Sequence, residues 1–151
     1  MPSRTGLPSR PKPEPTTAVQ HAAATIGAVL GLVGLLGFLP GLTVHLEDLT
    51  VAGARTTTLL FGLFAVSVVH NVIHLGLAVA GLAMATSARL ARWYLLAGGG
   101  VHLLIALTGL TPAAELFPLN TADNWLHLTL GAAMAGLSLL PGRARRTAKG
   151  L

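Results

Sequence analysis

Two copies of an Asn-x-x-His-Leu pentad are the residues best suited to chemistry in this chain. They occupy residues 71–75 (NVIHL) and 124–128 (NWLHL), both inside apolar stretches. Imidazole can bind a metal ion or carry a proton near neutral pH, and the asparagine amide can both donate and accept hydrogen bonds. Because polar side chains are costly in a membrane and usually functional there, the pentads mark the candidate site.

Further polar residues extend this candidate site. Ser67, His70, Asn71 and His74 follow one another at spacings of three and four, so they share one face of a predicted helix. Counting along the other predicted helices places His102 and His127 at a similar depth, in the outer half of the membrane. The predicted intramembrane polar cluster comprises Ser67, His70, Asn71, His74, His102, Asp123, Asn124 and His127.

Three interpretations of this cluster remain open. The favoured one is helix packing through interhelical hydrogen bonds, each contributing roughly 0.6 kcal/mol in membranes. The second is a metal or haem site, with His70, His74, His102 and His127 as the candidate ligands, since imidazole suits zinc, copper and iron. The third is a proton or substrate pathway. The sequence implies no cofactor strongly, because a His-x-x-x-His spacing recurs by chance.

The composition is that of an integral membrane protein. Of the 151 residues, 52% are hydrophobic and 10% are charged, whereas a soluble domain carries roughly 25% charged residues. Cysteine is absent, which excludes disulfides and Cys-ligated metal clusters. The net charge is +5, and the basic residues lie at the ends of the apolar blocks. We therefore expect the lipid bilayer as partner and no nucleic acid.

Four apolar blocks predict an all-α fold, a polytopic four-helix transmembrane bundle. The expected spans are residues 19–39, 62–86, 92–111 and 122–140, within a domain over residues 19–141. Residues 1–18 are rich in proline and predict a disordered cytoplasmic tail, and residues 142–151 predict a basic cytoplasmic tail. The start of the second helix is open, because its apolar block is longer than the bilayer core.

The charge pattern predicts the orientation. With four spans, every Lys and Arg except Arg55 falls on one side, and Glu47, Asp48, Glu115 and Asp123 fall on the other. The positive-inside rule then places both termini in the cytoplasm of a multi-pass plasma-membrane protein.

Small residues spaced four apart predict close helix packing. Gly27 and Gly31 form such a pair, as do Gly131 and Ala135, and residues 98–100 are all glycine. Small-residue faces let helix backbones approach closely, so they predict a tight bundle and also allow a homo-oligomer.

The two halves of the chain resemble each other. Residues 37–40 (GFLP) and 109–112 (GLTP) each end a predicted helix, and each is followed by a helix that carries the pentad. These matches suggest two duplicated helical hairpins that run in the same direction across the membrane. Such a duplication would place His74 opposite His127 across a pseudo-twofold axis.

Longer segments carry a resemblance to a known family. They are residues 37–43 (GFLPGLT), 60–81 (LFGLFAVSVVHNVIHLGLAVAG), 94–109 (YLLAGGGVHLLIALTG) and 121–131 (TADNWLHLTLG). Together they resemble the bacterial family called Domain of Unknown Function 4383 over about residues 20–140. The resemblance implies a small membrane protein of four helices with no assigned activity. It also implies that His70, His74 and His127 form the shared set, since the family pattern favours an aromatic residue at His102.

No conventional enzyme is predicted. Ser67 and Ser138 lack the base and acid that would activate a hydroxyl nucleophile, and cysteine is absent. The function expected from the sequence is a structural or accessory membrane protein. The alternative is a small binding or transport module that handles a metal ion, haem or protons.

Overall fold

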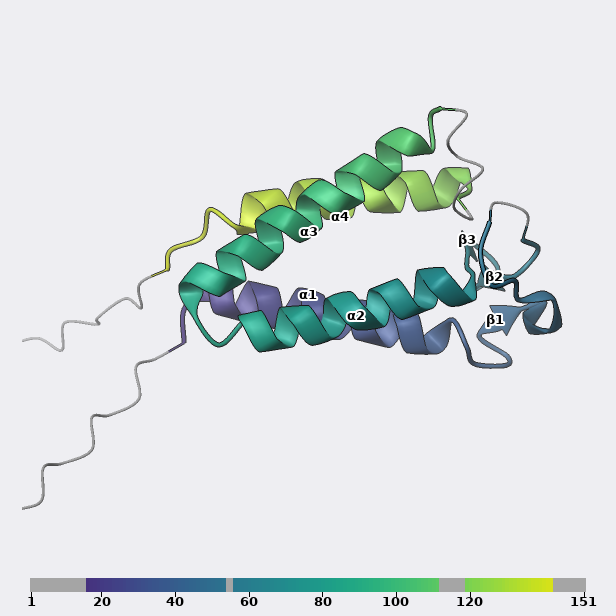
Figure 1. Ribbon diagram of the computed structural model, residues 1–151, viewed down its shortest axis with the longest axis horizontal. Helices are drawn as coiled ribbons and strands as arrows, with labels where there is room; N and C mark the ends of the chain where they lie inside the picture. The colour runs from purple at the N-terminus through teal and green to yellow at the C-terminus, as the bar shows by residue number, and fades with distance from the viewer. Residues whose placement is uncertain (1–15, 54–55, 112–118, 143–151) are drawn as a thin grey trace, which may run out of the picture.

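Two antiparallel helical hairpins make up most of the protein (Figure 1). The structure is a computed structural model, and it describes residues 16–53, 56–111 and 119–142. The first hairpin is formed by α1 (Ala18–Leu36) and α2 (Val68–Met84), and the second by α3 (Ala88–Thr108) and α4 (Thr121–Leu137). The four predicted helices are thus confirmed as helices. The predicted tails fall almost wholly outside the described residues.

The second helix begins later than the predicted start at residue 62. Ser67 has extended backbone angles and its side chain accepts a hydrogen bond from the His70 backbone N–H, which makes it the N-cap of α2. Just upstream, Phe61 and Gly62 both have positive φ, so the chain turns there instead of continuing a helix. The apolar block that made the second span seem long therefore contains non-helical chain.

That non-helical chain forms a small lobe, and the fold is mostly helical instead of purely α. Its strands are β1 (Thr43–Val44), β2 (Leu59–Leu60) and β3 (Phe64–Ala65), with the 3₁₀ turn η1 (Leu46–Asp48) after β1. The strands pair antiparallel in the order β1-β2-β3. We call residues 43–53 and 56–66 the β-lobe, and it lies at one end of the helices (Figure 1). The short turn between α2 and α3 lies at the other end, which we call the turn end.

Small residues set the distance between the helices of each hairpin. A Cβ added to Gly27 would lie 3.1 Å from the Ala78 carbonyl oxygen on α2. In the second hairpin, a Cβ added to Gly99 would lie 2.9 Å from the Gly131 carbonyl oxygen on α4. The predicted small-residue pairs therefore pack inside the hairpins.

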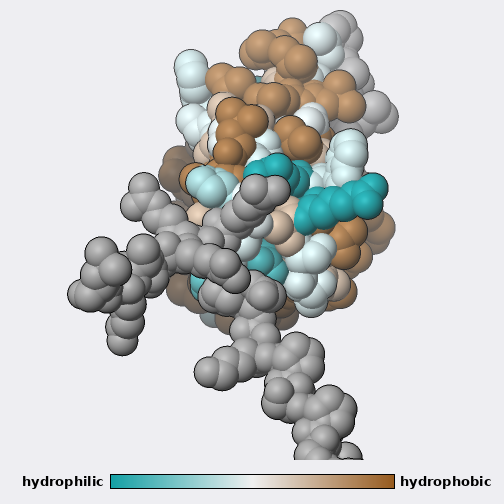
Figure 2. Space-filling view, turned by 90° about the vertical axis from the view of Figure 1, so that its left-hand side faces the viewer, coloured by the Kyte–Doolittle hydropathy of each residue, from teal (hydrophilic) through white to brown (hydrophobic). Residues whose placement is uncertain are grey.

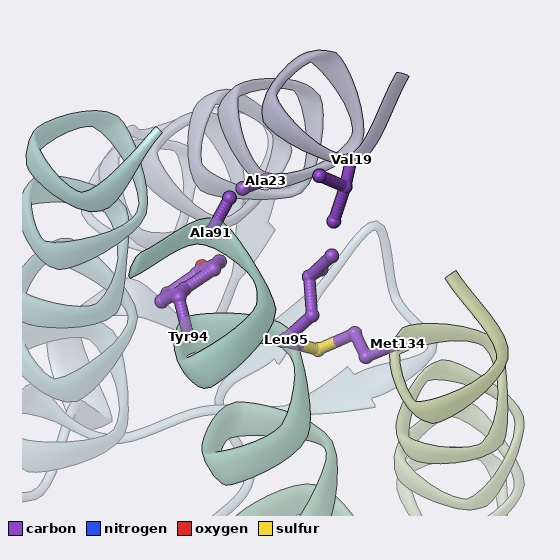
Figure 3. Close-up of a cluster of buried hydrophobic side chains, with 6 residues drawn as sticks. All are labelled: Val19, Ala23, Ala91, Tyr94, Leu95 and Met134. Carbon is purple, nitrogen blue, oxygen red and sulfur yellow. The ribbon is translucent and has the colours of Figure 1, made fainter. Parts of the chain in front are cut away.

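The two hairpins join through a compact apolar core near the turn end (Figure 3). Val19 of α1 faces Leu95 of α3, Ala23 of α1 lies beside Ala91 of α3, and Met134 of α4 reaches Leu95. A Cβ on Gly81 of α2 would lie 2.7 Å from the Tyr94 hydroxyl, so α2 also closes on this core. The side chains in the core are fully or almost fully buried: Val19, Ala23, Ala91, Tyr94, Leu95 and Met134.

The outer surface of the helices is apolar. Each of the four helices exposes large hydrophobic side chains, among them Leu35, Val79, Leu104 and Leu128. The only charged residues within these helices are Arg89, Arg92 and Asp123, all in the first two turns of their helices. By length and composition, α1 and α3 could each cross a membrane, and α2 is apolar but shorter.

Neighbouring glycines on α3 provide a test of the close helix contact. We expect Gly99→Ala to destabilise the protein by roughly 1–3 kcal/mol, because the new methyl group would press on the α4 backbone. Gly100→Ala is the matched control, since a Cβ there meets nothing within 4 Å, and it should be neutral or stabilise by up to about 1 kcal/mol. Thermal melts of both variants in detergent measure the difference. Equal melting temperatures would contradict the described packing.

Candidate functional site

Four histidine side chains from three helices meet in the interior. The ring centroids of His70 and His74 are 4.5 Å apart, and those of His102 and His127 are 5.4 Å apart. Between the hairpins, His70 lies 5.8 Å and His74 lies 6.4 Å from His127. We call His70, His74, His102 and His127 the histidine cluster. The structure thus brings together all four histidines that the sequence singled out.

The helices deliver these rings from the half of the bundle next to the β-lobe. His70 and His74 stand one turn apart in the first half of α2, and His127 stands in the second turn of α4. His102 lies in the second half of α3, which runs in the opposite direction. His74, His102 and His127 are buried and His70 is partly buried. Antiparallel hairpins therefore bring early residues of α2 and α4 level with a late residue of α3.

Backbone carbonyls determine the tautomer of two rings. Nδ1 of His102 lies 2.8 Å from the Gly98 carbonyl oxygen, and Nδ1 of His127 lies 2.8 Å from the Asp123 carbonyl oxygen. A carbonyl oxygen only accepts, so each Nδ1 carries the proton and donates. Each Nε2 then keeps a lone pair. A ring held in this way by a backbone carbonyl is the usual state of a histidine that ligates a metal ion.

A third ring has an unsatisfied nitrogen. Nδ1 of His74 is buried and has no hydrogen-bond partner among the described residues. A buried polar atom without a partner costs roughly 1–3 kcal/mol, so such atoms call for an explanation. The described residues also provide no hydrogen bond between one histidine ring and another. Of the interhelical bonds expected from the packing interpretation, the described residues show one within the predicted cluster, from the Asn124 side-chain amide to the Gly109 carbonyl oxygen at the end of α3. None of the interhelical bonds among the described residues is made by the four histidine rings, and the packing interpretation stays a prediction.

Two cavities adjoin the histidine cluster. A cavity of about 20 Å³ is lined by all four histidines together with Ile73, Leu77, Ile105 and Leu119. Its volume is enough for one ion or one water molecule. A second cavity of about 150 Å³ lies between α1, α4 and the β-lobe, and the four histidines line it too. The four histidines thus line both cavities.

The spacing of the nitrogens is close to that of a metal site. One nitrogen from each of His70, His74 and His127 lies within 4.8 Å of the other two. Around a tetrahedral zinc ion, ligand nitrogens are about 3.3 Å apart, given metal–nitrogen bonds of about 2.05 Å. Side-chain movements of about an ångström would therefore close these three rings on one ion. His102 is outside this group of three, although its ring centroid lies 5.4 Å from that of His127.

Asp123 lines the larger cavity beside the histidines, as the sequence predicted, and it also has a structural part. It is 2% exposed, and its Oδ2 accepts hydrogen bonds from the backbone N–H groups of Ala65 and Asn120. The Asn120 side chain caps α4 and donates to the Leu63 carbonyl oxygen. Asp123 and Asn120 thereby fasten the start of α4 to the β-lobe, a connection that joins the two hairpins above the histidine cluster.

Asn71 and Asn124 differ from the sequence prediction, which placed them around the histidines. Asn71 packs against Gly37 at the end of α1, and Asn124 packs against Gly109 at the end of α3. Neither asparagine lines the two cavities beside the histidine cluster. Each one instead belongs to the interior of its own hairpin. Ser67 is likewise removed from the site, because it is the N-cap of α2.

Sequence reasoning missed the residues that surround the rings. Leu60 and Phe64 of the β-lobe line the larger cavity, but Phe64 lies in the segment predicted as the second helix and Leu60 lies just before it. Leu30 of α1 also lines it, and nothing in its apolar block distinguished it. The hydrogen bond from His102 to the Gly98 carbonyl could have been inferred, because in a helix the carbonyl four residues earlier lies one turn below the side chain.

Comparison with known proteins identifies the family to which the chain belongs. Residues 20–140 match the family described as domain of unknown function (DUF4383). No curated protein and no solved structure matches the chain. The match confirms the resemblance read from the sequence and supplies no activity, so the function must be argued from the site.

Asp123→Ala tests the connection between α4 and the β-lobe. We expect a loss of roughly 2 kcal/mol or more, because two backbone N–H groups would lose a carboxylate acceptor. Backbone hydrogen exchange should rise in β3. Asp48→Ala is the control, since that carboxylate is exposed and, among the described residues, accepts a side-chain hydrogen bond only from the Thr57 hydroxyl. Its cost should stay below about 0.5 kcal/mol. A loss at Asp48 as large as at Asp123 would be the contrary result.

Proposed function

We propose that this chain, which belongs to the family described as domain of unknown function DUF4383, is a four-span membrane protein that binds one transition-metal ion at the histidine cluster. The observation that carries the proposal is the convergence of four imidazoles on a cavity of about 20 Å³. Metal binding was the less favoured interpretation of the sequence. The positions of the rings and their hydrogen bonds are what support it here.

The surface of the helices supports the membrane location. Large apolar side chains are exposed along all four helices, whereas soluble proteins rarely expose such contiguous apolar area. Two of the helices are long enough to cross a bilayer unaided. The exposed acidic residues Glu47 and Asp48 lie at the β-lobe end, and Arg89 and Arg92 lie at the turn end. This separation of charge supports cytoplasmic termini and an outward-facing β-lobe.

The hydrogen bonds of the rings support a metal ion as the ligand. His102 and His127 each direct a proton to a backbone carbonyl, which leaves lone pairs on both Nε2 atoms. His74 adds a buried nitrogen without a described partner. Lone pairs that converge on so small a cavity need a cation or a proton donor between them. A metal ion satisfies all of them at once.

The ligand set selects the metal. Four imidazole nitrogens suit Zn²⁺ and copper ions, whereas Mg²⁺ and Ca²⁺ prefer oxygen ligands. Haem is disfavoured by size, because the cavities of about 20 and 150 Å³ are well below the roughly 300 Å³ of small-molecule pockets. A fourth histidine would also occupy the position that catalytic zinc sites keep open. We therefore propose metal binding or transfer and not catalysis.

A structural or accessory role is the second candidate, and the asparagines favour it. Asn71 against Gly37 and Asn124 against Gly109 are equivalent contacts, one in each hairpin. They hold the ends of α1 and α3 against their partner helices. A protein built only to pack would use these contacts and leave the histidines without a ligand. A homo-oligomer remains part of this candidate, since Gly76, Gly100 and Gly136 expose small surfaces with nothing packed on them.

We also propose that the two hairpins are repeats. Ser67 and Asn120 cap α2 and α4, which have 17 residues each. Counting from these caps, Asn71 corresponds to Asn124 and His74 corresponds to His127. Gly37 and Gly109 end α1 and α3 in the same αR conformation. His74 and His127 are then related by a pseudo-twofold axis, in agreement with their central positions in the histidine cluster.

Cysteine labelling tests the orientation, since the chain has no cysteine of its own. Single cysteines at Thr5, Ala52 and Gly150 should react differently with an impermeant maleimide on intact cells. Ala52 is chosen because it is exposed on the β-lobe and its neighbour Gly53 has a positive φ. Only the Ala52→Cys variant should be labelled, and permeabilised cells should label all three. Labelling at Thr5 or Gly150 in intact cells would overturn the proposed orientation.

Metal loading of the purified protein tests the site. After treatment with a chelator, the protein in detergent should take up one Zn²⁺ per chain, and Co²⁺ should produce the visible absorption of a tetrahedral nitrogen site. Zinc at 100 times its Kd should stabilise the fold by roughly 2.7 kcal/mol. Acidification should release the ion, because protons compete with the metal for the imidazole nitrogens.

Substitutions separate metal binding from packing. His127→Gln should keep most of the metal-free stability, because an amide can still donate and accept, but it should lose the zinc-dependent stabilisation. His21→Gln and His45→Gln are the controls, since both rings lie outside the histidine cluster. Failure of the protein to retain zinc, or equal losses in the control variants, would leave the structural role as the better explanation.

A further inference from the structure

We infer that the turn end carries a binding site for the phosphodiester headgroup of an anionic phospholipid. A groove of about 610 Å³ runs between the start of α3 and the end of α4. It is lined by Ala88, Arg89, Arg92, Trp93, Leu96, Pro141 and Gly142. This inference rests on the proposed membrane location but not on the proposed metal site, which lies in the other half of the bundle.

The two arginines supply the charge that the groove would need. Arg89 and Arg92 are exposed and stand one helical turn apart, on the same side of α3. Nη2 of Arg92 donates to the Leu140 carbonyl oxygen at 3.0 Å, which holds its guanidinium across the groove at the end of α4. Arg89 has no hydrogen-bond partner among the described residues. A guanidinium has five N–H donors, so most donors of this pair are free to bind phosphate oxygens.

No described carboxylate competes for these donors. Glu47, Asp48 and Asp123, the acidic residues that the structure describes, all belong to the β-lobe end. Figure 2 looks onto the turn end and shows hydrophilic side chains beside apolar ones. The arginines therefore form a positive patch that no described side chain neutralises.

The rest of the groove suits a lipid better than a free anion. Ala88, Leu96 and Pro141 provide an apolar wall next to the guanidinium groups. Trp93 lies in the same groove and is 58% exposed, and tryptophan prefers the depth of the lipid headgroups. Basic pockets beside helix ends on the cytoplasmic side are known to hold anionic headgroups. A lipid could place its phosphodiester on the arginines and its acyl chains along the apolar surface of α3.

The two tryptophans of the chain permit a direct test. Trp93 lies at the turn end and Trp125 lies near the start of α4 at the other end. A Trp125→Phe variant in bilayers leaves Trp93 as the only tryptophan. Brominated phosphatidylglycerol and brominated phosphatidylcholine then compete to quench its fluorescence. We expect phosphatidylglycerol to be preferred by about threefold to tenfold at Trp93, and the preference should survive addition of millimolar inorganic phosphate.

Three further variants make the result specific. Arg89→Gln with Arg92→Gln, in the Trp125→Phe chain, should reduce the preference to about onefold. Arg145→Gln with Arg146→Gln removes the same charge from the C-terminal tail and should leave the preference intact. Trp93→Phe reports on Trp125, where we expect no preference.

Three outcomes would overturn the lipid site. They are an equal loss in the tail variant, no preference at Trp93, or abolition of the preference by inorganic phosphate. Quenching of Trp93 by both lipids would still establish the membrane location, so failure of this inference is distinguishable from failure of the proposed topology.

Discussion

The close approach of helix backbones inside each hairpin is the constraint on which the rest of the structure depends. Gly27 meets Ala78 and Gly81 in the first hairpin, and Gly99 meets Gly131 in the second. Contacts of this kind allow only one relative sliding position of the two helices, because a shift by one residue brings a side chain into the contact. The helices of a hairpin therefore have a fixed register, and every polar group on them has a fixed depth.

The histidine cluster is a consequence of that register. A Cβ on Gly34 would lie 3.1 Å from the Cβ of His74. The His74 side chain therefore starts directly beside the close contact between α1 and α2. The Asp123 and Gly98 carbonyls then orient His127 and His102 from within their own helices. Each ring is positioned by its own hairpin, and the pairing of the hairpins brings the rings together. The hairpins themselves are joined by an apolar core at one end and by the Asp123 hydrogen bonds at the other.

The sequence predicted the features that depend on local pattern. Hydrophobic blocks and Pro or Gly at their ends located four helices, and the spacing of His70 and His74 placed them on one face. The β-lobe was missed because its apolar residues, such as Leu60 and Phe64, look like helix residues until the positive φ of Phe61 and Gly62 is known. The asparagines were misplaced for a different reason. Helical spacing shows which residues share a face, but it cannot show that Asn71 turns towards Gly37 and away from the rings.

The length of α2 and α4 has a consequence for the surrounding lipid. Each has 17 residues, which corresponds to roughly 26 Å of helix, shorter than the roughly 30 Å hydrocarbon core of a typical bilayer. In the proposed arrangement, the hydrophobic mismatch would be greatest beside these two helices, where the β-lobe continues the chain. The bilayer would become thinner there, at a cost of a fraction of a kcal/mol per ångström. Such a protein would sort towards thin regions of membrane and bring water closer to the buried imidazoles from the outer side.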